Sequence, residues 1–115
     1  MPELEVKLVF LWSTSDREVA LTMIFMYLLS AKREDWWEEV TLIVWGPSAK
    51  LLAEDEELQD RLAKLGKEGV VLEACKSCAE IYGVADDLEE LGVDVYYIGE
   101  QLTDYIKEGR RLISL

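Results

Sequence analysis

The sequence predicts a single α/β domain, a three-layer sandwich in which helices cover both faces of a five-stranded, mainly parallel sheet. Three observations lead to this prediction. Short apolar runs alternate with segments of helical character along the whole chain, and this alternation is typical of parallel sheets. The length of 115 residues fits one domain, and the half of them that is apolar suffices for a continuous core. No repeat, linker or low-complexity tract divides residues 1–115.

The first predicted strand, Val6 to Trp12, is almost continuously apolar, as buried parallel strands are. Ser15 and Glu18 have the spacing of a capping box, so a helix is expected from Asp16 to Lys32. Apolar residues lie around more of this helix than the single face that can pack on the sheet: Val19, Leu21, Met23, Ile24, Phe25, Met26, Leu28 and Leu29. The remaining apolar surface must be covered by a subunit interface or by a second helix, and the first alternative predicts a homo-oligomer.

The middle of the chain predicts a second strand at Val40 to Trp45 and, after a turn at Gly46, a helix at Ala49 to Gly66. The acidic run Glu54 to Glu57 either breaks this helix and opens another, where acids suit the helix dipole, or binds a cation. The tryptophan pair Trp36-Trp37 either grips a flat ligand or packs at an edge or between subunits.

The remainder of the chain continues the same alternation. Three further strands are expected: Val70 to Ala74, Val93 to Ile98 and Arg111 to Leu115. Three short helices are expected with them: Lys76 to Tyr82, Asp86 to Leu91 and Thr103 to Glu108. A glycine follows each helix and suits the left-handed conformation that ends many helices: Gly83, Gly92 and Gly109.

Composition argues against several classes of function. Lys and Arg total 12 against 24 Asp and Glu, so the net charge is −12. This charge disfavours direct binding to nucleic acids or anionic membranes and suits partners with basic patches. The chain has no histidine, which excludes imidazole catalysis, His metal ligation and Cys–His dyads. No signal-peptide pattern appears and the longest apolar run, Val19 to Leu29, is too short to span a bilayer, so a cytoplasmic location is expected.

The two cysteines of the chain, Cys75 and Cys78, stand where the third strand runs into its helix. Cys75 is expected near the helix N-cap and Cys78 near the third helical position. Backbone N–H groups and the helix dipole favour the thiolate there, which is the reactive form of a cysteine. A spacing of three residues places both side chains on one face of the helix, within reach of a disulfide after small adjustment.

Four interpretations of this Cys-x-x-Cys pair compete. A structural zinc site needs four ligands, so zinc would need a second subunit, and no metal site or cofactor is expected within the chain. A thioredoxin-like redox centre has a proline downstream of its motif, whereas Pro2 and Pro47 both precede Cys75. Two cysteines packed as small hydrophobes would fit a non-catalytic oligomeric binding or scaffold subunit. We favour a nucleophilic thiol at the C-terminal edge of the sheet, where α/β proteins place their sites.

Several segments together resemble one known family. They are the first strand with its long apolar helix, the strand that ends at Gly46, the stretch Gly69 to Cys75 with Gly83-Val84, Leu91 to Val95, and the Ile98-Gly99 turn. With them, nearly the whole chain resembles the DsrE/DsrF-like (TusD-like) family of small sulfur-handling proteins. The resemblance implies a sulfur carrier, sulfurtransferase-like in its chemistry, that works with sulfur donor and acceptor proteins and often forms homo- or hetero-oligomers.

The resemblance also implies roles for particular residues. In that family a cysteine at the end of the third strand accepts sulfane sulfur as a persulfide, and Cys75 is the matching position. Cys78 is an addition to the simplest pattern that either resolves the persulfide as a disulfide or is inert. The residues themselves add two expectations. Lys76 is expected to add positive potential at the thiol, which Glu73 and the net charge of −12 oppose. Ser13, Thr14 and Ser15 end the first strand at the same sheet edge and are candidates to line the substrate pocket, although capping alone explains them.

Overall fold

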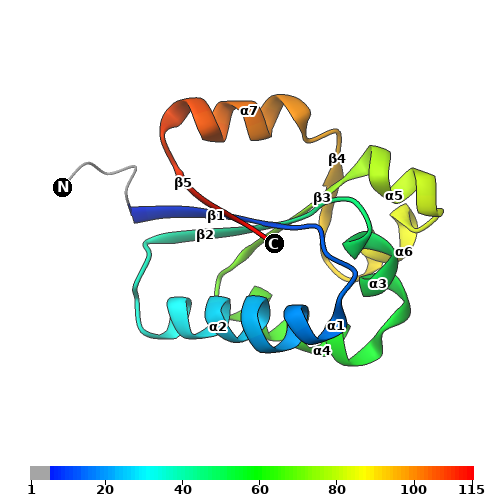
Figure 1. Cartoon of the computed structure of the whole chain (residues 1–115), viewed down its shortest axis with the longest axis horizontal. Helices are drawn as coiled ribbons and strands as arrows, with labels where there is room; N and C mark the ends of the chain where they lie inside the picture. The colour runs from blue at the N-terminus through cyan, green and yellow to red at the C-terminus, as the bar shows by residue number, and fades with distance from the viewer. Residues whose placement is uncertain (1–5) are drawn as a thin grey trace.

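The chain folds around a sheet of five strands in the order β4-β3-β2-β1-β5, and every pair of neighbouring strands is parallel (Figure 1). The coordinates are a computed structural model, and they describe residues 6–115. The strands are β1 Lys7–Trp12, β2 Glu39–Val44, β3 Val71–Cys75, β4 Asp94–Tyr96 and β5 Arg111–Ser114. The helices are α1 Arg17–Val19, η2 Ala20–Phe25, α2 Met26–Arg33, α3 Ser48–Glu54, α4 Glu56–Lys67, α5 Lys76–Tyr82, α6 Ala85–Glu90 and α7 Gly99–Glu108. The predicted α/β fold class is confirmed.

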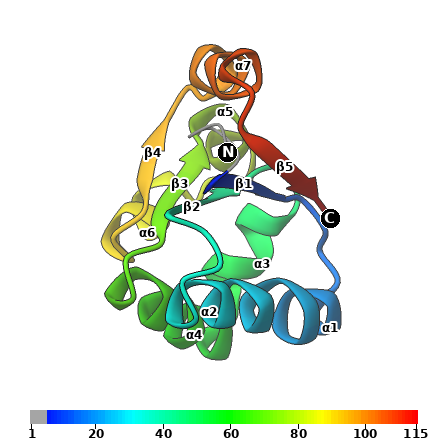
Figure 2. The ribbon, with the colours of Figure 1, turned by 90° about the vertical axis from the view of Figure 1, so that its left-hand side faces the viewer.

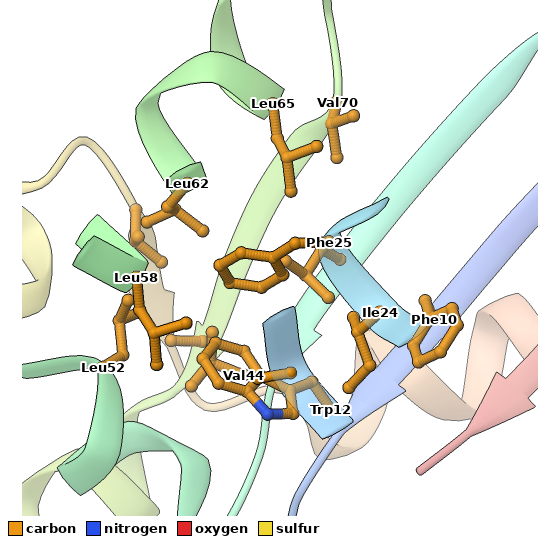
Figure 3. Close-up of a cluster of buried hydrophobic side chains, with 14 of the residues drawn as sticks. Phe10, Trp12, Ile24, Phe25, Val44, Leu52, Leu58, Leu62, Leu65 and Val70 are labelled. Carbon is orange, nitrogen blue, oxygen red and sulfur yellow. The ribbon is translucent and has the colours of Figure 1, made fainter. Parts of the chain in front are cut away.

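The two faces of the sheet are covered unequally. In Figures 1 and 2, α2 and α4 lie on one side of the sheet and α7 lies across the other. On the side of α2 and α4, Trp12 of β1 meets Phe25 edge to face, with ring centroids 5.1 Å apart, and leucines of α4 complete this larger core (Figure 3). On the α7 side, a smaller cluster joins Val9 and Ile43 of the sheet to Tyr105.

One continuous helical segment, made of α1, η2 and α2, follows β1, with a π-helical stretch over Ala20–Phe25. Its predicted capping box was wrong, because the cap lies one residue later. The Asp16 side chain accepts hydrogen bonds from the N–H groups of Glu18 and Val19, at 2.9 and 3.2 Å, while Ser15 is exposed. A carboxylate at this position satisfies two free N–H groups and also suits the helix dipole.

The acidic run after α3 divides the predicted long helix, as one of the two interpretations proposed. Asp55 ends α3, caps α4 by accepting from the N–H of Leu58, and accepts a second hydrogen bond from Arg17 at 2.6 Å. Arg17 also pairs with Glu57. The cation that this run binds in the structure is therefore the guanidinium of Arg17, and within residues 6–115 no cluster of three or more metal-ligating side chains occurs.

The last helix begins four residues earlier than predicted. α7 starts at Gly99, and the preceding strand is correspondingly short, because the N–H of Leu102 bonds to the carbonyl of Ile98 at 2.7 Å. Thr103 resembled a helix start, but it lies inside the helix and its hydroxyl donates back to the Gly99 carbonyl. Hydroxyl side chains use this local hydrogen bond when they lie within a helix.

The tryptophan pair packs against the end of the long helical segment. The indole N–H of Trp37 donates to the hydroxyl of Tyr27 at 2.9 Å, and the Trp36 ring lies 5.9 Å from the Tyr27 ring. Trp36 remains 57% exposed. This arrangement corresponds to the packing interpretation of the pair.

The N-cap of the long helical segment gives the first prediction. Asp16→Ala removes both capping hydrogen bonds and should lower the free energy of unfolding by about 0.5–2 kcal/mol, as measured by urea denaturation. Ser15→Ala is the matched control, and we expect it to change the free energy by less than about 0.5 kcal/mol. If Ser15→Ala lowered the free energy of unfolding more than Asp16→Ala, Ser15 would be the N-cap, as the sequence first indicated.

Candidate functional site

Cys75 is both the last residue of β3 and the N-cap of α5. Its sulfur accepts a hydrogen bond from the backbone N–H of Cys78 at 3.4 Å. The helix ends as predicted at Gly83, which has a φ of +69°. The strand therefore delivers the thiol directly to the N-terminus of a helix, in the position that the sequence indicated.

Cys78 lies one helical turn further on and is half-buried, and both cysteines are free thiols. Burial raises the pKa of the Cys78 thiol, and its interaction with Cys75 raises it further, whereas the backbone N–H of Gly46 acts in the opposite direction. Cys78 is accordingly held in the protonated form at neutral pH. It is a poorer nucleophile than an ordinary cysteine, since the thiolate is the reactive species.

Apolar side chains surround Cys75, which is only 7% exposed. It belongs to the smaller core cluster, in which Ile98 and Leu102 from the start of α7 face Leu11 and Ile43 from the sheet. Tyr96 of β4 is the register partner of Cys75 and packs against the same cluster. The first turn of α7 and the β4 end therefore form the immediate surroundings of the thiol.

Lys76 follows Cys75 directly, and its amino group lies over the ring of Tyr97, 5.2 Å from the centroid. The hydroxyl of Tyr97 in turn donates to Glu80 of α5 at 3.0 Å. These two contacts connect the end of β4 to the helix that Cys75 caps. The structure thus brings together Cys75, Cys78 and Lys76 of the predicted site residues.

The predicted serines and threonine lie at the end of β1, and β2 separates that strand from β3. The N–H groups of Ser13 and Thr14 both bond to the carbonyl of Leu115. Ser15 lines a hollow of about 330 Å³ together with residues of α3 and Tyr82, and neither cysteine lines it. A role of these three residues in substrate binding stays a prediction.

The burial of the Glu73 carboxylate beside the thiol, and its pairing with Tyr105, were not expected from the sequence. Glu73 is 8% exposed and lies two residues before Cys75 in β3, so both side chains point to the same face of the sheet. The hydroxyl of Tyr105 donates to its two carboxylate oxygens at 3.0 and 3.3 Å. The signal was present in the sequence: Glu73 is the acidic residue of an otherwise apolar run, Val70 to Cys75.

Two tyrosines flank this carboxylate. Burial, followed by the negative charge of Glu73, raises the pKa of Tyr105 to about 12 and also raises that of Tyr96. The hydroxyl of Tyr96 is buried and makes no hydrogen bond within residues 6–115. The guanidinium of Arg110 lies 4.3 Å from the centroid of the Tyr105 ring. Both phenols therefore keep their protons at neutral pH, and of the two only Tyr105 donates a hydrogen bond to Glu73.

The Glu73–Tyr105 hydrogen bonds give the second prediction. Tyr105→Phe leaves a buried carboxylate without this donor and should lower the free energy of unfolding at neutral pH by about 1–3 kcal/mol in urea denaturation. Because the folded pKa of about 12 lies above the ordinary value of 10, the wild type should lose stability as the pH rises from 10 through 12, and the variant should lose less. Tyr97→Phe is the control, since the Tyr97 hydroxyl is exposed. If Tyr105→Phe and Tyr97→Phe lost the same free energy of unfolding, the hydrogen bonds between Tyr105 and Glu73 would not be stabilising as proposed.

Fold and site together define a small α/β protein with a thiol at the carboxyl edge of an all-parallel sheet, placed where a strand becomes a helix. The model of the DsrE/DsrF-like family matches residues 6–115, so the chain belongs to this family and the resemblance read from the sequence is confirmed.

Three solved structures share the fold. A conserved protein of unknown function from Bacteroides thetaiotaomicron, BT1422, is 38% identical with a TM-score of 0.92, over 95% of this chain and 94% of that one. The ychN protein of E. coli is 15% identical with a TM-score of 0.75, over 95% and 98% of the two chains. MTH1491 from Methanobacterium thermoautotrophicum, also of unknown function, is 23% identical with a TM-score of 0.73, over the same shares. A search of curated proteins gave no significant match.

Proposed function

We propose that the chain is a sulfur carrier in which Cys75 takes up sulfane sulfur as a persulfide and passes it to a partner thiol. The observation that carries this proposal is the position of Cys75, whose sulfur accepts a backbone N–H at the start of a helix. This position places a backbone hydrogen-bond donor beside the sulfur atom that would carry charge during an exchange reaction. Membership of a family linked to sulfur relay supports the same chemistry.

The proposed transfer consists of two exchange steps. In the first, the Cys75 thiolate attacks the outer sulfur of a donor persulfide, a new S–S bond forms, and the donor leaves as a thiolate. In the second, an acceptor thiolate attacks the outer sulfur on Cys75 and Cys75 leaves as a thiolate. Neither step needs an oxidant or a cofactor. A reducing, cytoplasmic location would keep both cysteines available as thiols.

A second function is favoured by the burial of Cys75. A cysteine that is 7% exposed among apolar side chains also fits a purely structural role, in a binding or scaffold subunit without catalysis. Reactivity separates the two functions. A carrier thiol should react quickly with a small uncharged thiol reagent at neutral pH, whereas a packed cysteine should react only as the protein unfolds.

The unequal environments of the two cysteines give the third prediction. Polysulfide should load Cys75 of the wild type, Cys75→Ser should abolish loading, and Cys78→Ser should leave it largely intact, because burial holds Cys78 in the protonated form. Mass spectrometry before and after reductant measures the added sulfur. A longer-lived persulfide in Cys78→Ser would identify Cys78 as a resolving thiol, and an unchanged lifetime would identify it as structural.

Two results would count against this assignment. Equal loading of both single variants would contradict a dedicated nucleophile at Cys75. A wild type that no donor loads would favour the scaffold subunit.

We also propose that the long helical segment forms a subunit interface between copies of the chain. Met23 and Met26 are 52% and 56% exposed on it. Met23 and Tyr27 line an apolar hollow of about 320 Å³ with Phe10, Ile113 and Leu115. Phe25 is buried against Trp12 and so belongs to the core instead.

The fourth prediction tests this interface. Met26→Glu places a charge in the proposed contact and should shift the protein towards smaller species in sedimentation velocity at micromolar concentration. Ile106→Glu is the control, because Ile106 is equally exposed, at 56%, on α7. A monomeric wild type would disprove the interface.

A further inference from the structure

Another hollow lies beside the candidate site, between the end of β4 and the first turns of α7. Its volume is about 220 Å³, and its lining residues are Tyr96, Tyr97, Glu100, Gln101 and Asp104. Tyr97 is 61% exposed, and both carboxylates are exposed. The lining therefore combines aromatic surface with negative charge and contains neither lysine nor arginine.

Two lining residues connect this hollow to the surroundings of Cys75. Tyr96 is the register partner of Cys75 in the neighbouring strand. Tyr97 contacts Lys76 and Glu80 of the helix that Cys75 caps. A molecule in the hollow would thus lie against residues that pack around the thiol.

The chemistry of the hollow suits a cationic side chain. The ring of Tyr97 holds the amino group of Lys76, 5.2 Å from its centroid, so an incoming cation would bind chiefly to the carboxylates of the hollow. Glu100 and Asp104 supply these two carboxylates for an ammonium or guanidinium group. The net charge of −12 would in addition draw a basic partner to the surface.

We propose that this hollow binds a lysine or arginine side chain that flanks the cysteine of the sulfur-exchanging partner protein. Binding in the hollow would make Cys75 exchange sulfur preferentially with partner cysteines that have lysine or arginine close by. The inference rests on the proposed function, since the partner is the protein whose thiol exchanges sulfur with Cys75. Beyond that function, the inference specifies that the partner is positively charged near its cysteine and that Glu100 and Asp104 recognise this charge.

The test uses simple disulfide exchange and needs no persulfide. The parent protein is Cys78→Ser, which leaves Cys75 as its single thiol. The probes are two peptides of equal length with one cysteine, flanked by lysines in one and by glutamates in the other, each as a mixed disulfide with thionitrobenzoate. The Cys75 thiolate attacks the peptide sulfur, the Cys75–peptide disulfide forms, and thionitrobenzoate leaves as a coloured thiolate whose absorbance gives the rate.

We expect the lysine peptide to react at least about tenfold faster than the glutamate peptide at low salt, and the ratio to fall as salt screens the charges. Glu100→Gln combined with Asp104→Asn should reduce that ratio by about threefold to tenfold, as expected for the loss of two exposed charge contacts.

The chain offers a matched control for net charge. Another hollow with an acidic lining, between α3, α4 and α6, includes Asp87 and Glu90, which are exposed. Asp87→Asn combined with Glu90→Gln also removes two negative charges, from residues that do not line the hollow beside Tyr97. We expect this control to change the ratio by less than about twofold, because the charges that it removes act only over a distance.

Three outcomes would overturn the inference. Equal rates for the two peptides with the parent would show no selectivity, and equal effects of the two double variants would show that net charge alone acts. If neither peptide reacts, the inference also fails, and the protein is then tested with a small uncharged disulfide. If Cys75 reacts with this small disulfide, only the inference about the hollow is wrong. If Cys75 does not react with it, the proposed function is wrong as well.

Discussion

The site depends on the double position of Cys75, which ends a strand and caps a helix. The strand fixes the backbone on one side of the cysteine through parallel pairing with both neighbours, β2 and β4. The helix fixes the other side, and its first turn supplies the N–H group that the sulfur accepts. Because no loop separates the two elements, the thiol has little freedom to leave the edge of the sheet.

The parallel direction of the strands explains which residues lie near this thiol. In a parallel sheet all carboxyl ends lie at one edge, so Tyr96 in β4 becomes a neighbour of Cys75, and Gly46 after β2 becomes a neighbour of Cys78, although both are distant in sequence. The order of the strands then decides proximity. β2 stands between β1 and β3, which places Ser13 at the same edge but two strands away.

The unequal covering of the sheet gives the two faces different roles. The face towards α2 and α4 carries the larger apolar core, with Trp12 and Phe25 at its centre. The face towards α7 carries a smaller cluster that contains Cys75 and, beside it, the hydrogen-bonded pair of Glu73 and Tyr105. Burying a carboxylate costs free energy unless it is hydrogen-bonded, which explains why Glu73 is paired with Tyr105. The larger core is made of apolar side chains, and the α7 face holds the polar and reactive groups.

The sequence by itself determined the alternation of strands and helices, the glycine that ends α5 and the joint that carries Cys75, because periodicity and helix caps are local signals. It offered the break near Asp55 as one of two alternatives. It misplaced the cap at Ser15 and the start of α7, where several residues compete for the same role and local propensity does not choose among them. Only the tertiary structure decided the burial of Cys75, the pairing of Glu73 with Tyr105 and the hollow beside Tyr97. Each of these joins residues from different elements, and the order of the strands brings those elements together.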